Sequence, residues 1–228
     1  MSDLTAVLAM ARKDLRQELR SRAATVATLF FSGITLVIVA FALGRDSRLL
    51  AQAAPGVLWV AVVFAGVISA AQSFQSDREE GALEQTLSLP VSRASVYLGK
   101  LLANWLYLSV LGLVMMPIAL VLYGSSGLSG SLAPLLIVIT VLLGSLGFST
   151  IATFYAALTA NLQAREALLP VLMFPVVVPI LLAAVRATES LTGSADGGPA
   201  GEWMLLLAGF DLIYLVLCAS LFHLVVEE

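Results

Sequence analysis

The chain has 228 residues, of which 60% are hydrophobic and only 12% are charged, and its mean hydropathy is +0.99. Soluble domains carry about 25% charged residues, so this composition excludes a soluble globular protein and indicates an integral membrane protein. The net charge of −3 excludes the basic stripe that a nucleic-acid-binding protein needs. The single cysteine cannot form a disulfide within the chain.

The N-terminal segment, residues 1–22, has apolar side chains at helical spacing with basic residues between them. This pattern predicts an amphipathic helix that lies along the inner leaflet of the membrane and does not cross it. A positively charged anchor with no further role is the alternative. The apolar side chains of the predicted helix are Leu4, Val7, Leu8, Ala11, Leu15 and Leu19.

Six stretches are predicted to be transmembrane helices, because about 20 apolar residues are needed to cross about 30 Å of hydrocarbon. They comprise 23–43, 54–74, 101–123, 132–161, 167–186 and 203–226. Small residues recur at every fourth position in two of these spans, which lets helix backbones approach inside a bundle or at a dimer interface. The rows are Ala61, Ala65, Ser69 and Ser73 in the second span, and Ser145, Ser149, Thr153 and Ala157 in the fourth.

The lysine and arginine residues indicate how the spans are oriented. Of the twelve in the chain, nine lie on the side that includes residues 1–22 and 75–100, and three lie on the other side. Because cytoplasmic loops carry the excess of positive charge, both termini and residues 75–100 are predicted to be cytoplasmic.

The fifth span contains three prolines, Pro170, Pro175 and Pro179. Each removes a backbone hydrogen bond and crowds the preceding turn, so this span is predicted to be kinked or broken. A moving hinge and a static kink are both consistent with the pattern.

One ionisable residue, Asp211, lies about eight residues inside the sixth span. Such residues at membrane depth often belong to ion or proton pathways. A carboxylate that takes part in transport and pairs with Arg186 is one interpretation. The other is a side chain that caps or bends the helix near the interface.

Catalytic and metal-binding motifs are missing from the sequence, and no catalytic or metal-ligating residue is predicted. No GxxxxGK[ST] phosphate loop occurs, so the chain itself is not expected to hydrolyse ATP. Four further residues are candidates for a pathway or for structural polar contacts: Trp59, Gln72, Asn104 and Trp105.

The charged segment 75–100 is predicted to be largely helical. Ser76 and Glu79 have the spacing of a capping box that starts a short amphipathic helix, and Pro90 ends it. Ser92 then caps a second helix that continues into the third span. The leucines of the first helix would be exposed beside acidic residues, which indicates a contact site. The alternative is a solvent-exposed helical linker that binds no partner.

Three motifs of this segment resemble the cytoplasmic loop of ABC-2-type exporter permeases: Asp77-Arg-Glu-Glu-Gly-Ala-Leu-Glu84, Leu89-Pro-Val-Ser92 and Leu98-Gly-Lys-Leu101. Upstream, the run Ala54-Pro-Gly-Val-Leu-Trp-Val-Ala61 is similar to the permease family of the haem exporter in cytochrome c maturation. Asn104 differs from that family, where a histidine is common at this position.

The resemblance implies a single transmembrane domain over residues 1–228, of the ABC-2 (type V) exporter class. Six transmembrane helices, an N-terminal interfacial helix and a cytoplasmic coupling helix would form this all-α domain in the bacterial inner membrane. The coupling helix docks on an ATPase subunit in that family. The residues expected to make this contact are Asp77, Glu79, Glu80, Gly81, Leu83, Glu84 and Leu87.

The implied function is that of a permease subunit, which couples ATP hydrolysis by a separate ABC ATPase to haem export or delivery for c-type cytochrome maturation. The expected partners are the ATPase, a second copy of the chain, a haem-handling membrane protein, a periplasmic haem chaperone and membrane lipid. ATP and magnesium would bind to the ATPase, and haem is a candidate substrate, although the sequence shows no haem ligand. A general ABC-2 permease for a lipid, drug or glycan, and an ATP-independent scaffold, remain the alternatives.

Overall fold

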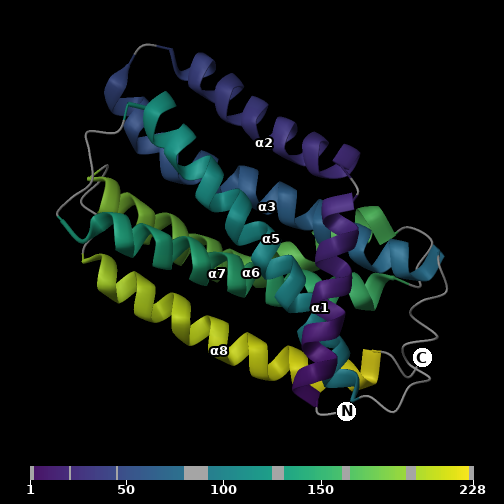
Figure 1. The fold of residues 1–228 in the computed structure, drawn as a ribbon. Coiled ribbons are helices and arrows are strands. Elements are labelled where there is room, and N and C mark those ends of the chain that lie inside the picture. Colours follow the sequence, from purple (N-terminus) through teal and green to yellow (C-terminus); the bar gives the residue numbers. More distant parts are fainter. Residues whose placement is uncertain are drawn as a thin grey trace.

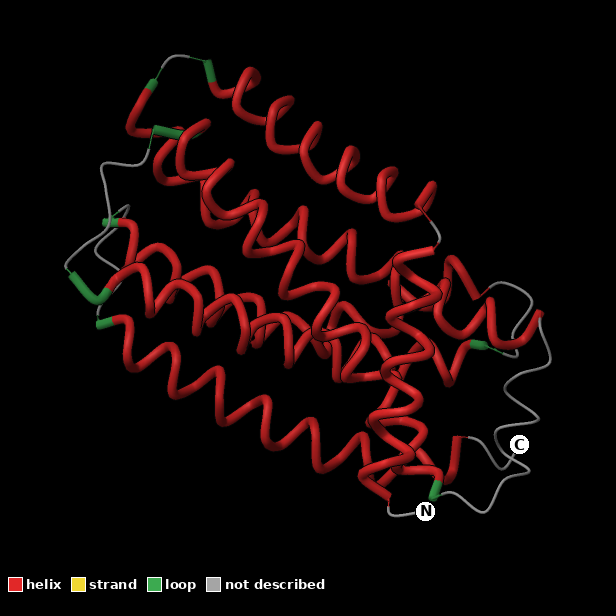
Figure 2. Tube along the Cα trace, viewed as in Figure 1, coloured by secondary structure: helices red, strands yellow, loops and turns green. Residues whose placement is uncertain are grey.

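The computed structural model describes residues 3–20, 22–44, 46–79, 92–124, 131–160, 165–193 and 199–225. The described residues are almost entirely helical, with no strand among them (Figure 1, Figure 2). The helices are α1 (Asp3–Arg20), α2 (Arg22–Leu43), α3 (Ser47–Glu79), α5 (Arg93–Leu122), α6 (Ala133–Thr159), α7 (Arg165–Thr192) and α8 (Ala200–Val225).

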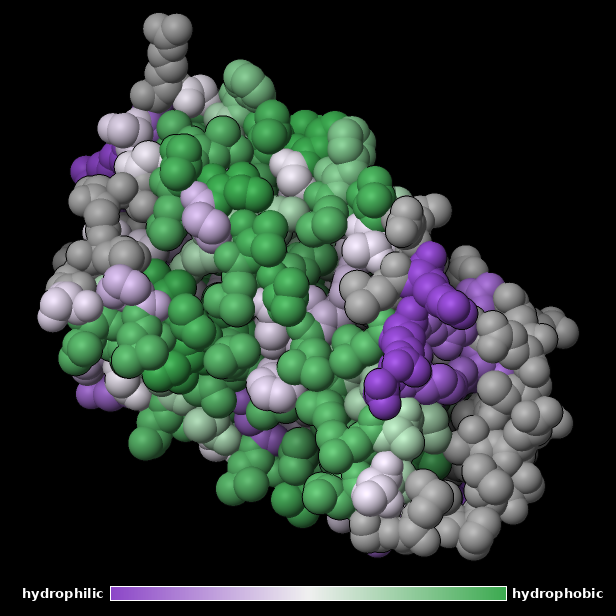
Figure 3. Space-filling view, in the orientation of Figure 1, coloured by the Kyte–Doolittle hydropathy of each residue, from purple (hydrophilic) through white to green (hydrophobic). Residues whose placement is uncertain are grey.

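Six of these helices form a bundle, and α1 lies across one end of it (Figure 1). Each of the six is long and apolar enough to cross a membrane, so the predicted number of spans is confirmed. On the face that Figure 3 shows, apolar side chains cover most of the bundle, and a hydrophilic group lies over α1. The start of α1 and the end of α8 lie at the same end (Figure 1).

The boundaries of two spans differ from the prediction. Helix α3 continues to Glu79 without a break, so Ser76 does not start a new helix and the capping-box interpretation of Ser76 and Glu79 is wrong. In contrast, Ser92 caps α5 as predicted, because its side chain accepts a hydrogen bond from the Ser95 backbone N–H at 3.2 Å. The segment 75–100 therefore differs from the prediction at its start, and residues 80–91 lie outside the described residues.

At the opposite end of the bundle, three helices are each followed by a glycine in a left-handed conformation. Gly44, Gly124 and Gly193 follow α2, α5 and α7, and their φ angles are 72°, 59° and 65°. A left-handed residue just after a helix is the usual way to end it, and glycine adopts this conformation without steric cost. Three helices therefore end at this side of the bundle through the same backbone device.

Helices α3 and α6 pack through two reciprocal contacts between a glycine and an aromatic ring. A Cβ placed on Gly144 of α6 would lie 2.2 Å from the Trp59 ring, and one on Gly66 of α3 would lie 2.3 Å from the Phe148 ring. The absence of a side chain at each glycine lets the facing ring approach the backbone closely. The predicted small-residue rows lie in the same region, and most of their members are buried, which places these faces inside the bundle.

Helix α7 is continuous from Arg165 to Thr192 although it contains all three prolines. The span is therefore not broken. Neighbouring helices α6 and α8 pack along it, and buried packing of this kind supports a proline-containing helix in a membrane.

Candidate functional site

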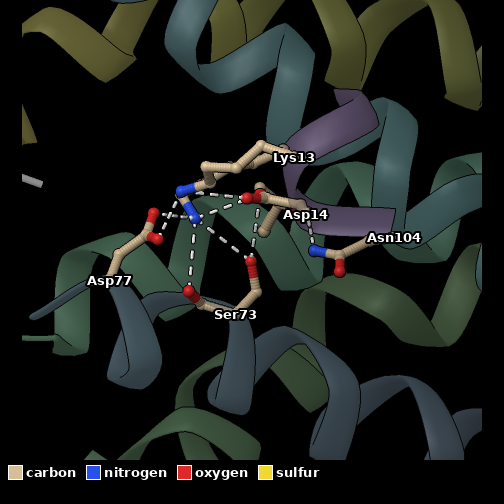
Figure 4. A network of polar contacts seen from close by, with 7 residues as sticks. Lys13, Asp14, Ser73, Asp77 and Asn104 are labelled. Atoms are coloured by element: carbon tan, nitrogen blue, oxygen red, sulfur yellow. Dashed lines mark hydrogen bonds and ion pairs between the residues drawn. The ribbon is translucent and has the colours of Figure 1, made fainter. Parts of the chain in front are cut away.

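Four charged side chains meet where α1 crosses α3 and α5. Lys13 and Asp14 come from α1, Asp77 from the end of α3, and Lys100 from the start of α5 (Figure 4). Lys100 Nζ lies 2.6 Å from Asp77 Oδ2 and 3.2 Å from Asp14 Oδ2. Lys13 Nζ lies 2.5 Å from Asp77 Oδ1 and 3.2 Å from Asp14 Oδ1. We refer to these four residues as the charge cluster.

Lys100 is the centre of the charge cluster and is fully buried, with a side-chain exposure of 0%. Its ammonium also donates to the Ser73 carbonyl oxygen at 3.2 Å and to Ser73 Oγ at 3.1 Å, and it lies 4.6 Å from the centre of the Phe74 ring. A buried ammonium is tolerated only where such partners replace water. The cluster has equal numbers of positive and negative groups, so it carries no net charge.

The pKa values of Lys13 and Asp77 indicate that both side chains are ionised. Burial opposes the charge of Lys13, but its hydrogen bond to Asp77 and the charges of Asp14 and Asp77 together raise its pKa. Burial alone would raise the pKa of Asp77, but the charges and hydrogen bonds of Lys100 and Lys13 lower it. Lys13 and Asp77 therefore form an ion pair at neutral pH.

A polar cavity of about 290 Å³ lies beside the charge cluster, between α1, α3 and α5. Its described lining includes Asp14, Glu18, Gln72, Asn104 and Tyr107, and only two lining residues are apolar. Burial, together with the charge of Asp14, raises the pKa of Glu18. The cavity therefore offers a polar space next to the ion pairs, at the end of the bundle that α1 covers.

The structure brings together three of the residues predicted from the sequence. Gln72 and Asn104 line the same cavity, and Asp77 belongs to the charge cluster next to it. Asn104 Nδ2 donates to Thr153 Oγ1 on α6 at 3.0 Å, which fixes its position at the cavity wall. Gln72 and Asp77 lie on α3 and Asn104 on α5, and the sequence alone did not indicate that these two helices bring them together.

Trp59 and Trp105 lie elsewhere and make packing contacts. The Trp59 indole N–H donates to Thr188 Oγ1 on α7 at 3.1 Å, and its ring fills the space at Gly144. The Trp105 indole N–H donates to the Leu142 carbonyl on α6 at 2.9 Å. Each indole N–H therefore has a partner within the bundle.

Asp211 does not pair with Arg186, and that interpretation is wrong. Arg186 instead pairs with Glu189 at 3.0 Å on its own helix. Asp211 is 4% exposed, its carboxylate lies against Gly147 of α6, and neither oxygen has a hydrogen-bond partner among the described residues. Buried carboxyl groups without partners are rare.

The remaining predicted contact residues cannot be placed. The side chain of Glu79, and all of Glu80, Gly81, Leu83, Glu84 and Leu87, lie outside the described residues. Their assignment to an ATPase contact stays a prediction, as does that of Asp77, which the structure places in the charge cluster.

Sequence reasoning missed Lys13, Asp14, Ser73 and Lys100 as a group. The predicted apolar stripe of α1 is only partly buried: Ala11 is buried, whereas Leu4 and Leu8 are 70% and 54% exposed. The one available signal was Asp14, an acidic residue among basic ones on the face of α1 that meets the bundle. Its partners on α3 and α5 are not visible in the pattern of a single helix.

The model of the CcmB protein family matches residues 5–225, which are almost the entire chain. The chain belongs to the CcmB family. Among its relatives, heme exporter protein B of Pseudomonas aeruginosa is 33% identical over 190 residues, which are 83% of this chain and 82% of the relative. The proteins of the same name from Rhodobacter capsulatus and Paracoccus denitrificans are each 31% identical, over 88% and 90% of this chain. This CcmB-family match confirms the resemblance inferred from the sequence motifs.

Proposed function

We propose that this chain is the permease subunit of an ABC transporter that exports or delivers haem for the maturation of c-type cytochromes. The observation that carries this proposal is the match to relatives named heme exporter protein B, which spans 82% to 91% of the length of the three described above. The six apolar helices are consistent with a multi-pass membrane subunit. We place it in the bacterial inner membrane, as one transmembrane domain.

A separate ABC ATPase supplies the energy in this proposal. The sequence contains no phosphate-binding loop of its own. Positive charge is concentrated at the end of the bundle where α1 lies, which supports a cytoplasmic location for that end and for both termini. Helix α3 ends and α5 begins at this end of the bundle, and we propose that the sequence between them contacts the cytoplasmic ATPase.

Haem is the proposed cargo, and we assign most of its binding to partner proteins. Histidine, cysteine and methionine are the side chains that most often ligate haem iron. The chain contains only one histidine, His223, and one cysteine, Cys218. We propose a second copy of the chain, a haem-handling membrane protein and a periplasmic haem chaperone as the other components.

The test is complementation in a bacterium that makes c-type cytochromes and lacks its own gene of this family. Expression of this chain with its cognate ATPase should restore covalently bound haem on those cytochromes, measured by haem staining after denaturing electrophoresis. An ATPase variant with its phosphate-loop lysine replaced is the control and should not restore it. Normal haem attachment in the deletion strain without this chain would reject the proposal, as would failure of the ATPase to copurify with it.

A further inference from the structure

The charge cluster lies at both ends of the segment that the proposed function assigns to the ATPase. Asp77 lies two residues before the end of α3, and Lys100 lies seven residues after the start of α5. Residues 80–91 connect the two helices. Any displacement of the end of α3 relative to α5 therefore acts directly on the Asp77–Lys100 pair.

The three helices that meet at the cluster are not joined in the same way. Helix α1 packs closely on α5: a Cβ on Gly99 would lie 2.6 Å from Met10 Cβ and 3.1 Å from the Val7 carbonyl oxygen. Among the described residues, in contrast, α1 has little backbone contact with α3. Helices α1 and α5 thus form one tightly packed unit at this end.

The connection between α1 and the end of α3 is largely electrostatic, whereas α5 also packs directly on α3. Lys100 and Lys13 both reach Asp77, and Ser73 of α3 contacts Asp14 and Lys100 (Figure 4). The cavity of about 290 Å³ lies between the same helices, so apolar packing does not replace these contacts there. The ion pairs are the direct link between α3 and α1.

We propose that Lys100, with Asp77 and Lys13, is a positioning group that transmits movement of the end of α3 to α1. This inference rests on the proposed function, because it takes the ATPase as the source of the movement. The buried pairs resist separation, since an unpaired buried charge is costly, and α1 therefore follows the end of α3. The cavity gives the helices space in which to shift.

The decisive variant is the double substitution Lys100→Met and Asp77→Asn, studied in the complex with the ATPase. It removes one positive and one negative group and leaves the Lys13–Asp14 pair in place, so no net charge is buried without a partner. We expect the complex to assemble and hydrolyse ATP. Haem attachment to c-type cytochromes should fall at least about fivefold per ATP hydrolysed, the lower end of typical coupling between sites.

A matched control is Arg186→Met with Glu189→Gln, which removes the ion pair on α7. This variant should retain haem attachment and its ratio to ATP hydrolysis. Wild-type output per ATP in Lys100→Met/Asp77→Asn, at normal assembly, would overturn the proposal and leave the cluster a purely structural role.

A second variant keeps the inference testable if the double variant does not assemble. Lys13 is 40% exposed, so Lys13→Gln should preserve the fold while it weakens the link between α1 and α3. We expect normal copurification of the ATPase and a lower output per ATP, whereas unchanged output would overturn the proposal. Failure of the unmodified chain to bind an ATPase would be a different result, because it would reject the proposed function itself.

Discussion

Lys100 shows how a charge can be retained in the interior of a membrane protein. Two carboxylates, a carbonyl, a hydroxyl and an aromatic face surround its ammonium, and together they replace the water that it loses. In the sequence alone, Lys100 is one more positive charge at the start of a predicted span. Its burial depends on α1, which is far from it in the chain.

The stability of the cluster should depend on pH at both extremes. The pKa of Asp77 is lowered from its ordinary value of 3.8, so its stabilising effect is present above that value and is lost as the pH falls through the folded-state pKa. The pKa of Lys13 is raised from 10.5, so its effect is present below that value and is lost as the pH rises through the raised pKa.

Thermal unfolding of the detergent-purified protein can measure these two effects. The difference in Tm between the unmodified chain and Asp77→Asn should be constant near neutral pH and should shrink below about pH 4, where carboxylates protonate. The corresponding difference for Lys13→Gln should shrink only above about pH 10. A difference that changes between pH 6 and 8 would contradict this assignment.

Asp211 offers a separate test at the residue scale. Its two oxygens are buried without a described partner, so Asp211→Asn should leave Tm unchanged or raise it, because the substitution removes no ion pair of the described structure. We expect haem attachment to fall in the same variant, since a residue that does not stabilise the fold at membrane depth is usually kept for function. Normal haem attachment would show that the carboxylate has no role in transport.

At the scale of the helices, the Trp59 and Phe148 rings that pack against Gly144 and Gly66 determine how closely α3 and α6 approach. Gly144→Ala should destabilise the protein by about 1–3 kcal/mol, the usual cost of forcing extra volume into a packed core, because the new Cβ would lie 2.2 Å from a rigid indole ring. The Tm of Gly144→Ala, measured against the unmodified chain, tests this.

Gly33→Ala is the matched control for this prediction. Gly33 lies inside α2, and a Cβ there meets nothing within 4 Å. Alanine has the higher helix propensity, by about 1 kcal/mol in a helix interior, so this variant should be as stable as the unmodified chain or more stable. Equal destabilisation by both substitutions would mean that the ring contacts do not set the distance between the helices.

Much of the fold was predictable from the sequence, because hydrophobic length alone identifies helices that cross a membrane. The ends of those helices were less predictable. Ser92, which caps α5, follows a proline by two residues in the sequence, and proline disfavours a helix that would run through it. Ser76 has the same capping chemistry but follows a stretch with no glycine or proline, and α3 continues through it.

The candidate site was predictable only in part. Gln72 and Asn104 were identified as polar residues in an apolar chain, and Asp77 was identified through the family resemblance of its segment. Their meeting with Lys13 and Asp14 depends on how α1 crosses the bundle, and the periodicity of one helix contains no information about its tertiary partners.

At the scale of the whole molecule, the arrangement predicts which positions face each side of the membrane. Cys218 is the only cysteine and is buried, so it should not react with a membrane-impermeant maleimide. A cysteine in place of the exposed Asp46 should react in intact spheroplasts, because positive charge is concentrated at the opposite end of the bundle.

A cysteine in place of Arg16 is the reciprocal probe, because Arg16 is exposed on α1. It should react only after the membrane is permeabilised. Labelling of the Arg16→Cys variant in intact cells, with none at position 46, would invert the proposed orientation.

The burial of Lys100 also has a consequence for biosynthesis. Helix α1 leaves the ribosome before α3 and α5, yet its partners in the charge cluster lie on those two helices. Lys100 can be fully enclosed only when α1 packs over it. Helix α1 therefore reaches its final position after helices that are synthesised later, and until then the lysines of the cluster are free to act as topological signals.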